Sequence, residues 1–266
     1  MKKILQYKFV SFFLLAFCIS AFGQSNAQIE QELTKAIEEV QKYSTYGDNH
    51  DEDKLDKAND EFKKKLLKYT KKTATLKYNF PKLGELIIIA TSNDGKFRTY
   101  SWDEEHGGTM HDYAVVYQYQ GADGKVYSRT DKEAATDGGN IGAFVYSIYA
   151  VNSKKGKVYV VCSTFIAGNS NHYGSANLYK IKGDKLVDKV KLFKTKKGFT
   201  DSIGFDYDFF SVVDRPERPI KLILFDEKRK TVKIPVVIKK NENDYGDVTD
   251  RFINYRFNGA YFVKSK

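Results

Sequence analysis

Short apolar runs separated by turn signals fill the chain after residue 80, and this pattern constrains the fold more than any other feature. β-branched and aromatic residues dominate the runs, and such residues favour strands. Turn-forming combinations of Asn, Asp, Gly and Lys separate the runs at residues 93–96, 122–125, 154–157 and 182–185. Each combination is expected to close a β-hairpin. The pattern therefore predicts an antiparallel β domain over residues 79–266.

Three of these turns continue alike, with Gly, Lys and then an apolar residue, at spacings near thirty residues. Such weak repetition suits a β-propeller, whose blades have four strands each and whose rings usually need at least four blades. Residues 86–264 hold about a dozen strands, enough for only about three blades. We therefore prefer a sandwich or an open, barrel-like sheet and keep a propeller-like arrangement as the alternative.

Residues 24–78 have a helical pattern instead. Apolar residues recur with the spacing of one helical face over residues 28–42 and again in a second segment that ends near Lys71. Small polar residues at positions 43–50 separate the two predicted helices. Each apolar stripe is narrow and must be covered by another element. The predicted fold class is therefore α+β, with an N-terminal helical hairpin packed on the large antiparallel β domain.

One run, at residues 158–166, is apolar on both faces of the predicted strand. A strand of this kind is typical of the middle of a structure, where both faces are covered. We therefore expect this strand to be central. Cys162, which lies within it, is then interpreted as a small core residue and not as a reactive thiol.

The first 23 residues have the composition of an export signal. Lysines precede an apolar run at residues 10–17, and Ala21-Phe22-Gly23 forms a small-x-small cleavage site. We predict cleavage after Gly23 and a periplasmic or secreted product. No later segment approaches the about 20 apolar residues that span a bilayer, so no transmembrane helix is expected in the mature chain. A lipid anchor at Cys18 is not expected, because the large Phe17 precedes it.

Charge argues against nucleic acid as a partner. Removal of the signal lowers Lys and Arg from 44 to 41 against 34 acidic residues, which leaves a net charge of +7. The lysines are interleaved with acids, as on a solvated surface. Only Cys162 remains after cleavage, so no disulfide can form within the chain and an apolar core must supply the stability.

Three segments carry a resemblance to known sequences: IATSNDGKFRTYSWDEEHGGTMHDY, GFDYDFFSVV and VTDRFINYRFNGAYFV. They resemble conserved hypothetical exported proteins of the Bacteroidota, over most of the chain from Phe80 onward. The resemblance implies export and a β-rich fold. It implies no known activity, so no functional residue is carried over from it.

The most unusual stretch is residues 98–113, which contains the only Trp, two of the four His and four carboxylates around a Gly-Gly pair. Its candidate ligand-binding residues are Trp102, Asp103, His106 and His111. Such a mixture could bind a metal or supply acid and base groups, but the spacing matches no known site. A hairpin loop with solvated acids explains the whole stretch without a ligand, with Trp102 in the core, and is the preferred interpretation.

A second candidate is the polar sequence at residues 168–175, interpreted as a long loop after the most apolar strand. Asn169, Asn171, His172 and Tyr173 could form hydrogen bonds with a sugar or peptide. Asp206 and Asp208 lie two residues apart, about 7 Å along a strand, which suits a glycosidase pair. Alternation along the strand explains the two aspartates as a solvent-exposed face.

These observations support three hypotheses about function. The first is a non-enzymatic envelope protein that binds a glycan, peptide or protein partner through its sheet-edge loops. The second is a hydrolase of cell-wall or glycan substrates, which uses Asp or Glu with His106 or His111 and needs these groups within contact distance. The third, an inhibitor of host lysozyme, fits poorly because both proteins are basic. Since no catalytic motif is present, the first is preferred, with no metal site and no cofactor.

Overall fold

The computed structural model describes residues 24–130, 142–154 and 156–265. The predicted export signal at residues 1–23, Cys18 included, lies outside the described residues. No helix in the described part of the chain is long and apolar enough to span a membrane.

Two long helices begin the described chain, close to the predicted positions. Helix α1 starts behind a capping box in which Ser25 and Gln28 satisfy each other's backbone N–H groups. Helix α2 starts behind Asp51, whose side chain accepts a hydrogen bond from the Lys54 backbone N–H. The helical segments are α1 (Asn26–Lys42), α2 (Glu52–Tyr69), α3 (Thr73–Lys77) and two 3-10 turns, η1 (Leu83–Glu85) and η2 (Phe209–Ser211).

The strands form three open sheets. The first sheet contains β1 (Ile88–Thr91), β2 (Phe97–Asp103), β3 (Tyr113–Gln120) and β4 (Val126–Thr130). The second contains β5 (Phe144–Ser153), β6 (Gly156–Ile166), β7 (Asn171–Lys182) and β11 (Ser202–Asp208), with β8 (Lys185–Val187) paired to β7. The third contains β9 (Phe193–Thr195), β10 (Gly198–Thr200), β12 (Leu224–Asp226), β13 (Thr231–Ile238), β14 (Asp247–Phe257) and β15 (Phe262–Ser265).

All four predicted hairpin turns are confirmed. They connect β1 to β2, β3 to β4, β5 to β6 and β7 to β8, and each pair is antiparallel. Gly95, Gly124 and Gly183 adopt the positive φ angles that these turns need, at 67°, 80° and 61°. Glycine adopts such angles without steric cost, which is why the turn signals in the sequence were reliable.

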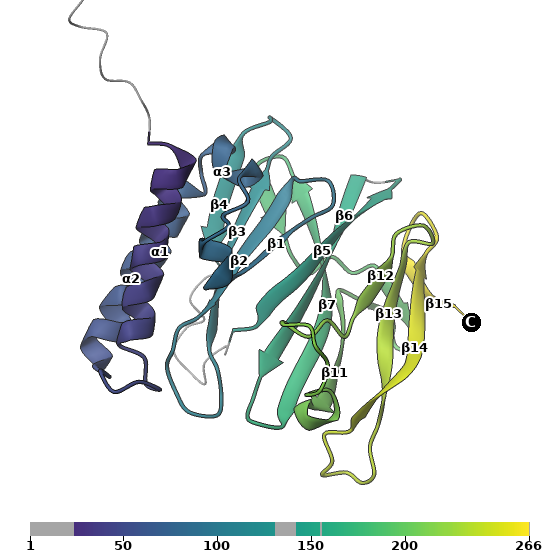
Figure 1. The fold of residues 1–266 in the computed structure, drawn as a ribbon. Coiled ribbons are helices and arrows are strands. Elements are labelled where there is room, and N and C mark those ends of the chain that lie inside the picture. The colour runs from purple at the N-terminus through teal and green to yellow at the C-terminus, as the bar shows by residue number, and fades with distance from the viewer. Residues whose placement is uncertain (1–23, 131–141, 155, 266) are drawn as a thin grey trace, which may run out of the picture.

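The helices and sheets stack as four layers (Figure 1). One apolar core lies between the helical hairpin and the first sheet, a second between the first and second sheets, and a third between the second and third sheets. Strand β6 shows how the middle layers serve two cores: Val158, Val160 and Cys162 pack toward the third sheet, while Tyr159 and Val161 pack toward the first. The predicted central position of this strand is confirmed.

The α+β class is confirmed, but the β part differs from the predicted arrangements in two ways. It is a stack of three open sheets, none of them closed, so it is more than a two-layer sandwich. It is also not purely antiparallel, because β15 pairs with β9 in parallel. The chain leaves the second sheet after β8 and returns to it only at β11, an excursion that no local sequence signal reveals.

The burial of Cys162 agrees with its interpretation as a core residue. Its side chain is fully buried in β6. Burial raises the pKa of the thiol to about 12, because the charged thiolate is disfavoured away from water. Cys162 is therefore an apolar packing residue at physiological pH.

Candidate functional site

A cleft of about 530 Å³ lies between the first sheet, the second sheet and the segment that follows β11. It gathers side chains from segments far apart in the sequence. Its lining consists of residues 84–88, 101–103 and 218–220 together with Glu105, Tyr113, Phe144, Thr164, Ile166, His172, Tyr207 and Phe209. The cleft thus brings together Asp103 and His172, which come from the two stretches that the sequence singled out.

Asp103, at one wall of the cleft, forms a hydrogen-bonded pair with His111, which does not itself line the cleft. Oδ2 of Asp103 lies 2.5 Å from Nδ1 of His111, and Oδ1 accepts a hydrogen bond from the Glu105 backbone N–H at 2.9 Å. The backbone N–H of His111 donates to the carbonyl of Ile166, which joins the loop to strand β6. The carboxylate therefore fixes the orientation of the imidazole ring and occupies its Nδ1 atom.

Glu105 is held in the cleft by the connection between the two long helices. Ser44 donates to its Oε2 at 2.7 Å, and the backbone N–H of Thr45 donates to its carbonyl oxygen. Its φ angle is 61°, an uncommon conformation for a residue other than glycine that tends to occur at functional sites. Burial raises the pKa of Glu105, and the charge of Asp103 raises it further. The cleft wall therefore carries two neighbouring carboxyl groups.

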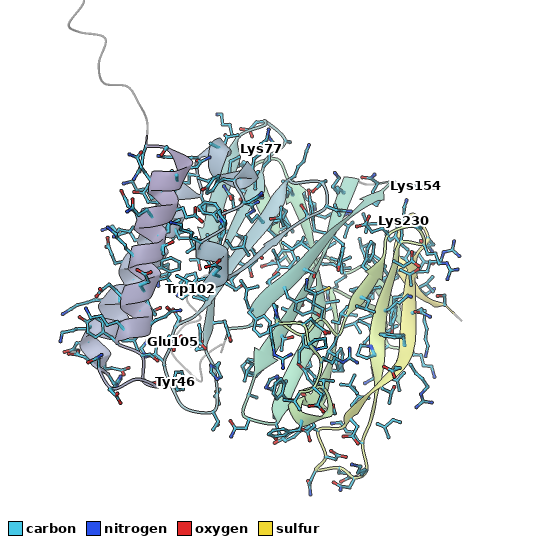
Figure 2. All side chains as sticks on the ribbon, in the orientation of Figure 1. Tyr46, Lys77, Trp102, Glu105, Lys154 and Lys230 are labelled. Carbon is cyan, nitrogen blue, oxygen red and sulfur yellow. The ribbon has the colours of Figure 1, made fainter. Side chains whose placement is uncertain are left out.

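Trp102 occupies the core, in agreement with the simpler interpretation of the sequence. It is 1% exposed, packs edge-on against Phe62 with the ring centres 5.0 Å apart, and is one of the residues that line the cleft. Figure 2 shows Trp102 and Glu105 beside the helical layer. The indole N–H donates to Asn59 Oδ1 at 3.0 Å, and Asn59 Nδ2 donates to the Glu104 carbonyl. The indole therefore positions the loop through Asn59.

Asn59 is a residue that the sequence reasoning missed. It lies on the apolar stripe of α2 between Leu55 and Phe62, and it is buried. A polar residue inside an apolar helical stripe usually satisfies a specific buried partner. The polar Asn59 among apolar residues of the stripe was therefore the sequence signal for a buried hydrogen-bond partner.

His172 lies inside the cleft and is 6% exposed. Its ring stacks on Phe209 with centres 4.6 Å apart and meets Tyr207 edge-on. The pKa of His172 is lowered from 6.5 to about 4, mainly by burial and also by the nearby His111, while Asp208 acts in the opposite direction. The imidazole is therefore neutral near pH 7 and can both donate and accept a hydrogen bond.

Acidification should destabilise the protein through His172. Between pH 6.5 and about 4 the unfolded chain binds a proton at this residue and the folded chain does not. The free energy of unfolding should therefore fall as pH decreases through this range, by at most about 3 kcal/mol. Urea unfolding of wild type and His172→Phe near neutral pH and at about pH 4.5 tests this. A variant that loses as much stability as wild type would contradict the prediction.

The predicted loop at residues 168–175 is wrong in extent. Strand β7 begins at Asn171 and pairs with both β6 and β11, so only the residues before it form a turn. Gly174 fits there because a side chain would lie 2.9 Å from the ring of Phe205. Asn169 remains exposed in the turn, and Tyr173, 38% exposed, alternates with His172 along the strand and does not line the cleft.

His106 lies apart from the cleft, against helix α2. Its ring contacts Glu52 at 3.1 Å and Asp56 at 3.3 Å. Asp206 is also outside the cleft, exposed on β11, while Asp208 accepts a hydrogen bond from the Phe210 backbone N–H. The solvent-face interpretation therefore holds for Asp206, and neither aspartate lines the cleft as a glycosidase pair would need.

Residues 218–220 also line the cleft, and the sequence did not predict their contribution. The Arg218 guanidinium donates to the carbonyls of Val213, Arg215 and Glu217, so the segment folds around its own arginine. The two prolines at 216 and 219 mark a rigid turn in the sequence. They do not indicate where in the fold that turn lies.

Comparisons with known proteins identified no relative of this chain. No family model matches the chain, and no curated protein and no solved structure matches it either.

Proposed function

We propose that this chain is an exported envelope protein that binds a glycan in the cleft without transforming it. The predicted export signal supports a periplasmic or secreted location. The observation that carries the proposal is the convergence in one cleft of the carboxyl groups of Asp103 and Glu105 with the neutral imidazole of His172.

The chemistry of the lining suits a sugar. Carboxylates accept hydrogen bonds from hydroxyl groups, and such charge-assisted bonds are stronger than neutral ones. Half-buried aromatic rings at Tyr113 and Phe209 offer apolar faces to the C–H side of a sugar ring. A volume of about 530 Å³ lies within the range of small-ligand sites, large enough for part of an oligosaccharide.

A glycan fits the cleft better than an extended peptide. Peptides that bind to sheets usually add a strand along an exposed edge and are held by backbone hydrogen bonds. This cleft lies instead between layers, and the polar groups proposed to bind the ligand are side chains: Asp103 from β2, Glu105 from the loop after β2 and His172 from β7. Two exposed apolar side chains widen the surface available to a longer chain: Tyr46, on the connection between the two long helices, and Met110, on the loop that carries Glu105 and His111.

Replacement of Asp103 by Asn should weaken glycan binding about tenfold or more, because a hydrogen bond to a charged group contributes about 1.5–3 kcal/mol. The protein is first screened on an array of bacterial, plant and host glycans, and titration calorimetry is then performed with a bound glycan. The matched control is Asp206→Asn, an exposed aspartate outside the cleft. Equal affinity of the Asp103 variant and wild type, or no glycan bound at all, would contradict the proposal.

A hydrolase is the second candidate, favoured by the Asp103–His111 pair. A carboxylate that holds Nδ1 of a histidine leaves Nε2 to act as a general base. The same glycans incubated with the protein distinguish the candidates, since hydrolysis releases new reducing ends with time and binding alone does not.

A further inference from the structure

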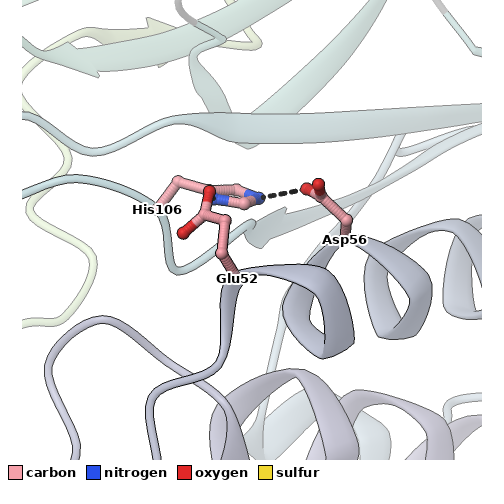
Figure 3. Close-up of side chains that lie close together, drawn as sticks. All are labelled: Glu52, Asp56 and His106. Atoms are coloured by element: carbon pink, nitrogen blue, oxygen red, sulfur yellow. Dashed lines mark hydrogen bonds and ion pairs between the residues drawn. The ribbon is translucent and has the colours of Figure 1, made fainter.

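A second group of chemically active side chains lies outside the cleft, where the loop after β2 meets helix α2. His106 of the loop faces Glu52 and Asp56, which are one helical turn apart on α2 (Figure 3). One ligand atom from each of the three residues lies within 4.8 Å of the others. Atoms at such separations can all reach one metal ion at ligand distances of about 2.0–2.2 Å after small side-chain rotations.

A second histidine approaches the same group. Nε2 of His50 lies 3.6 Å from Oε2 of Glu52, and its Nδ1 lies 3.3 Å from the carbonyl oxygen of Tyr43. A carbonyl oxygen only accepts hydrogen bonds, so Nδ1 carries a proton, and the other ring nitrogen, Nε2, faces Glu52. Metal-binding histidines typically have this second contact to a backbone carbonyl, which fixes the ring and its tautomer.

The alternative to a metal is a set of ion pairs. An imidazolium ion at His106 would donate to both carboxylates. Of the two carboxylates, an imidazolium ion at His50 would donate to Glu52 alone. A divalent cation satisfies both contacts at once, because it accepts electron pairs from two imidazole nitrogens and two carboxylates.

We propose that His50, Glu52, Asp56 and His106 form a surface binding site for a divalent transition-metal ion of the Zn²⁺ type. Mixed imidazole and carboxylate ligands favour Zn²⁺ over Mg²⁺ or Ca²⁺, which prefer oxygen ligands alone. The sequence predicted no metal site, because the acids within residues 103–112 lack a metal-binding spacing. The fold supplies the carboxylates from helix α2, about fifty residues earlier in the chain.

The position of the site suggests what the ion does. Hydrogen bonds join the helical hairpin to the loop that carries Glu105 and His111 at two points, Asn59 of helix α2 and Thr45 of the connection that precedes it. An ion between Glu52, Asp56 and His106 adds a third connection at the tip of that loop. Metal binding at this point braces one wall of the cleft but does not require that the cleft bind a glycan.

The experiment is calorimetric titration of ZnCl₂ into the tag-free, chelator-treated protein. We expect saturable binding of one ion per chain. Each of the variants His106→Ala, Asp56→Asn and His50→Ala should weaken it about tenfold or more. Asp60→Asn is the matched control, since Asp60 lies one turn further along α2 and pairs with Lys63; it should bind Zn²⁺ as wild type does.

Co²⁺ provides a second measurement, because its visible absorption reports the ligand set directly. Wild type and Asp60→Asn should give the same spectrum, and His106→Ala should lose it. Circular dichroism verifies that the variants are folded. Their positions at the surface of the protein mean that loss of the fold on substitution is not the expected cause of weaker binding. Absence of saturable Zn²⁺ binding, or affinity in His106→Ala equal to wild type, would overturn the proposal, and unchanged affinity in His50→Ala would overturn the four-ligand site.

Discussion

Trp102→Ala should lower the free energy of unfolding by about 3–5 kcal/mol, the usual cost of removing a large buried aromatic side chain. The indole is almost completely buried between the helical hairpin and the first sheet and packs against Phe62. Its removal also leaves Oδ1 of Asn59 without the indole donor, and an unsatisfied buried polar atom adds to the loss. Chemical denaturation followed by circular dichroism measures the change.

Two further variants separate the contributions at this position. Trp102→Phe keeps much of the apolar volume but removes the N–H donor, so it should cost less than the alanine substitution. Asn59→Ala removes the partner and also the hydrogen bond to the Glu104 carbonyl. If Trp102→Ala were as stable as wild type, the indole would not be the packing residue that the structure describes.

Glu30→Ala should destabilise the protein by about 2–4 kcal/mol, a large effect for a glutamate. Glu30 lies buried on helix α1. Its Oε1 accepts from the backbone N–H groups of Lys82 and Leu83 at 2.8 and 3.1 Å, and its Oε2 accepts from the Tyr78 hydroxyl at 2.8 Å. Each donor left buried without a partner costs about 1–3 kcal/mol. Thermal and urea unfolding quantify the loss.

The same carboxylate holds the 3-10 turn η1, and the residues of this turn form part of the cleft wall. Glu30→Gln keeps one oxygen acceptor and should lose less stability than Glu30→Ala. Glu38→Ala, on the exposed side of the same helix, is the control for a glutamate without this role and should change the stability by at most about 0.5 kcal/mol. Similar losses in Glu30→Ala and Glu38→Ala would show that the buried contacts carry no stability.

Local features of the fold could be predicted from the sequence because local physics determines them. The turns at residues 93–96 and 122–125 form where glycine permits a positive φ angle, and the helical stripes follow from the spacing of apolar residues. The core position of Trp102 follows from its size, and the central position of β6 follows from its two apolar faces.

Features that depend on distant segments could not be predicted in this way. Asp103 and His172 were both chosen from the sequence, but only the fold places them in one cleft. His106 was grouped with His111 because they are close in the chain, whereas it contacts α2. The polar residues at 171–175 suggested a loop, yet pairing of β7 with strands on both sides outweighs their weak preference for strands.

The order in which the chain visits the sheets has a consequence for how the protein can be divided. The chain passes from the first sheet to the second once, between β4 and β5, but it passes between the second and third sheets three times. No single cut therefore separates those two sheets: removal of everything after β8 also removes β11, whose Tyr207 lines the cleft. The third sheet is remote from Asp103 along the chain, yet no truncation after β8 removes it without also removing a strand that lines the cleft.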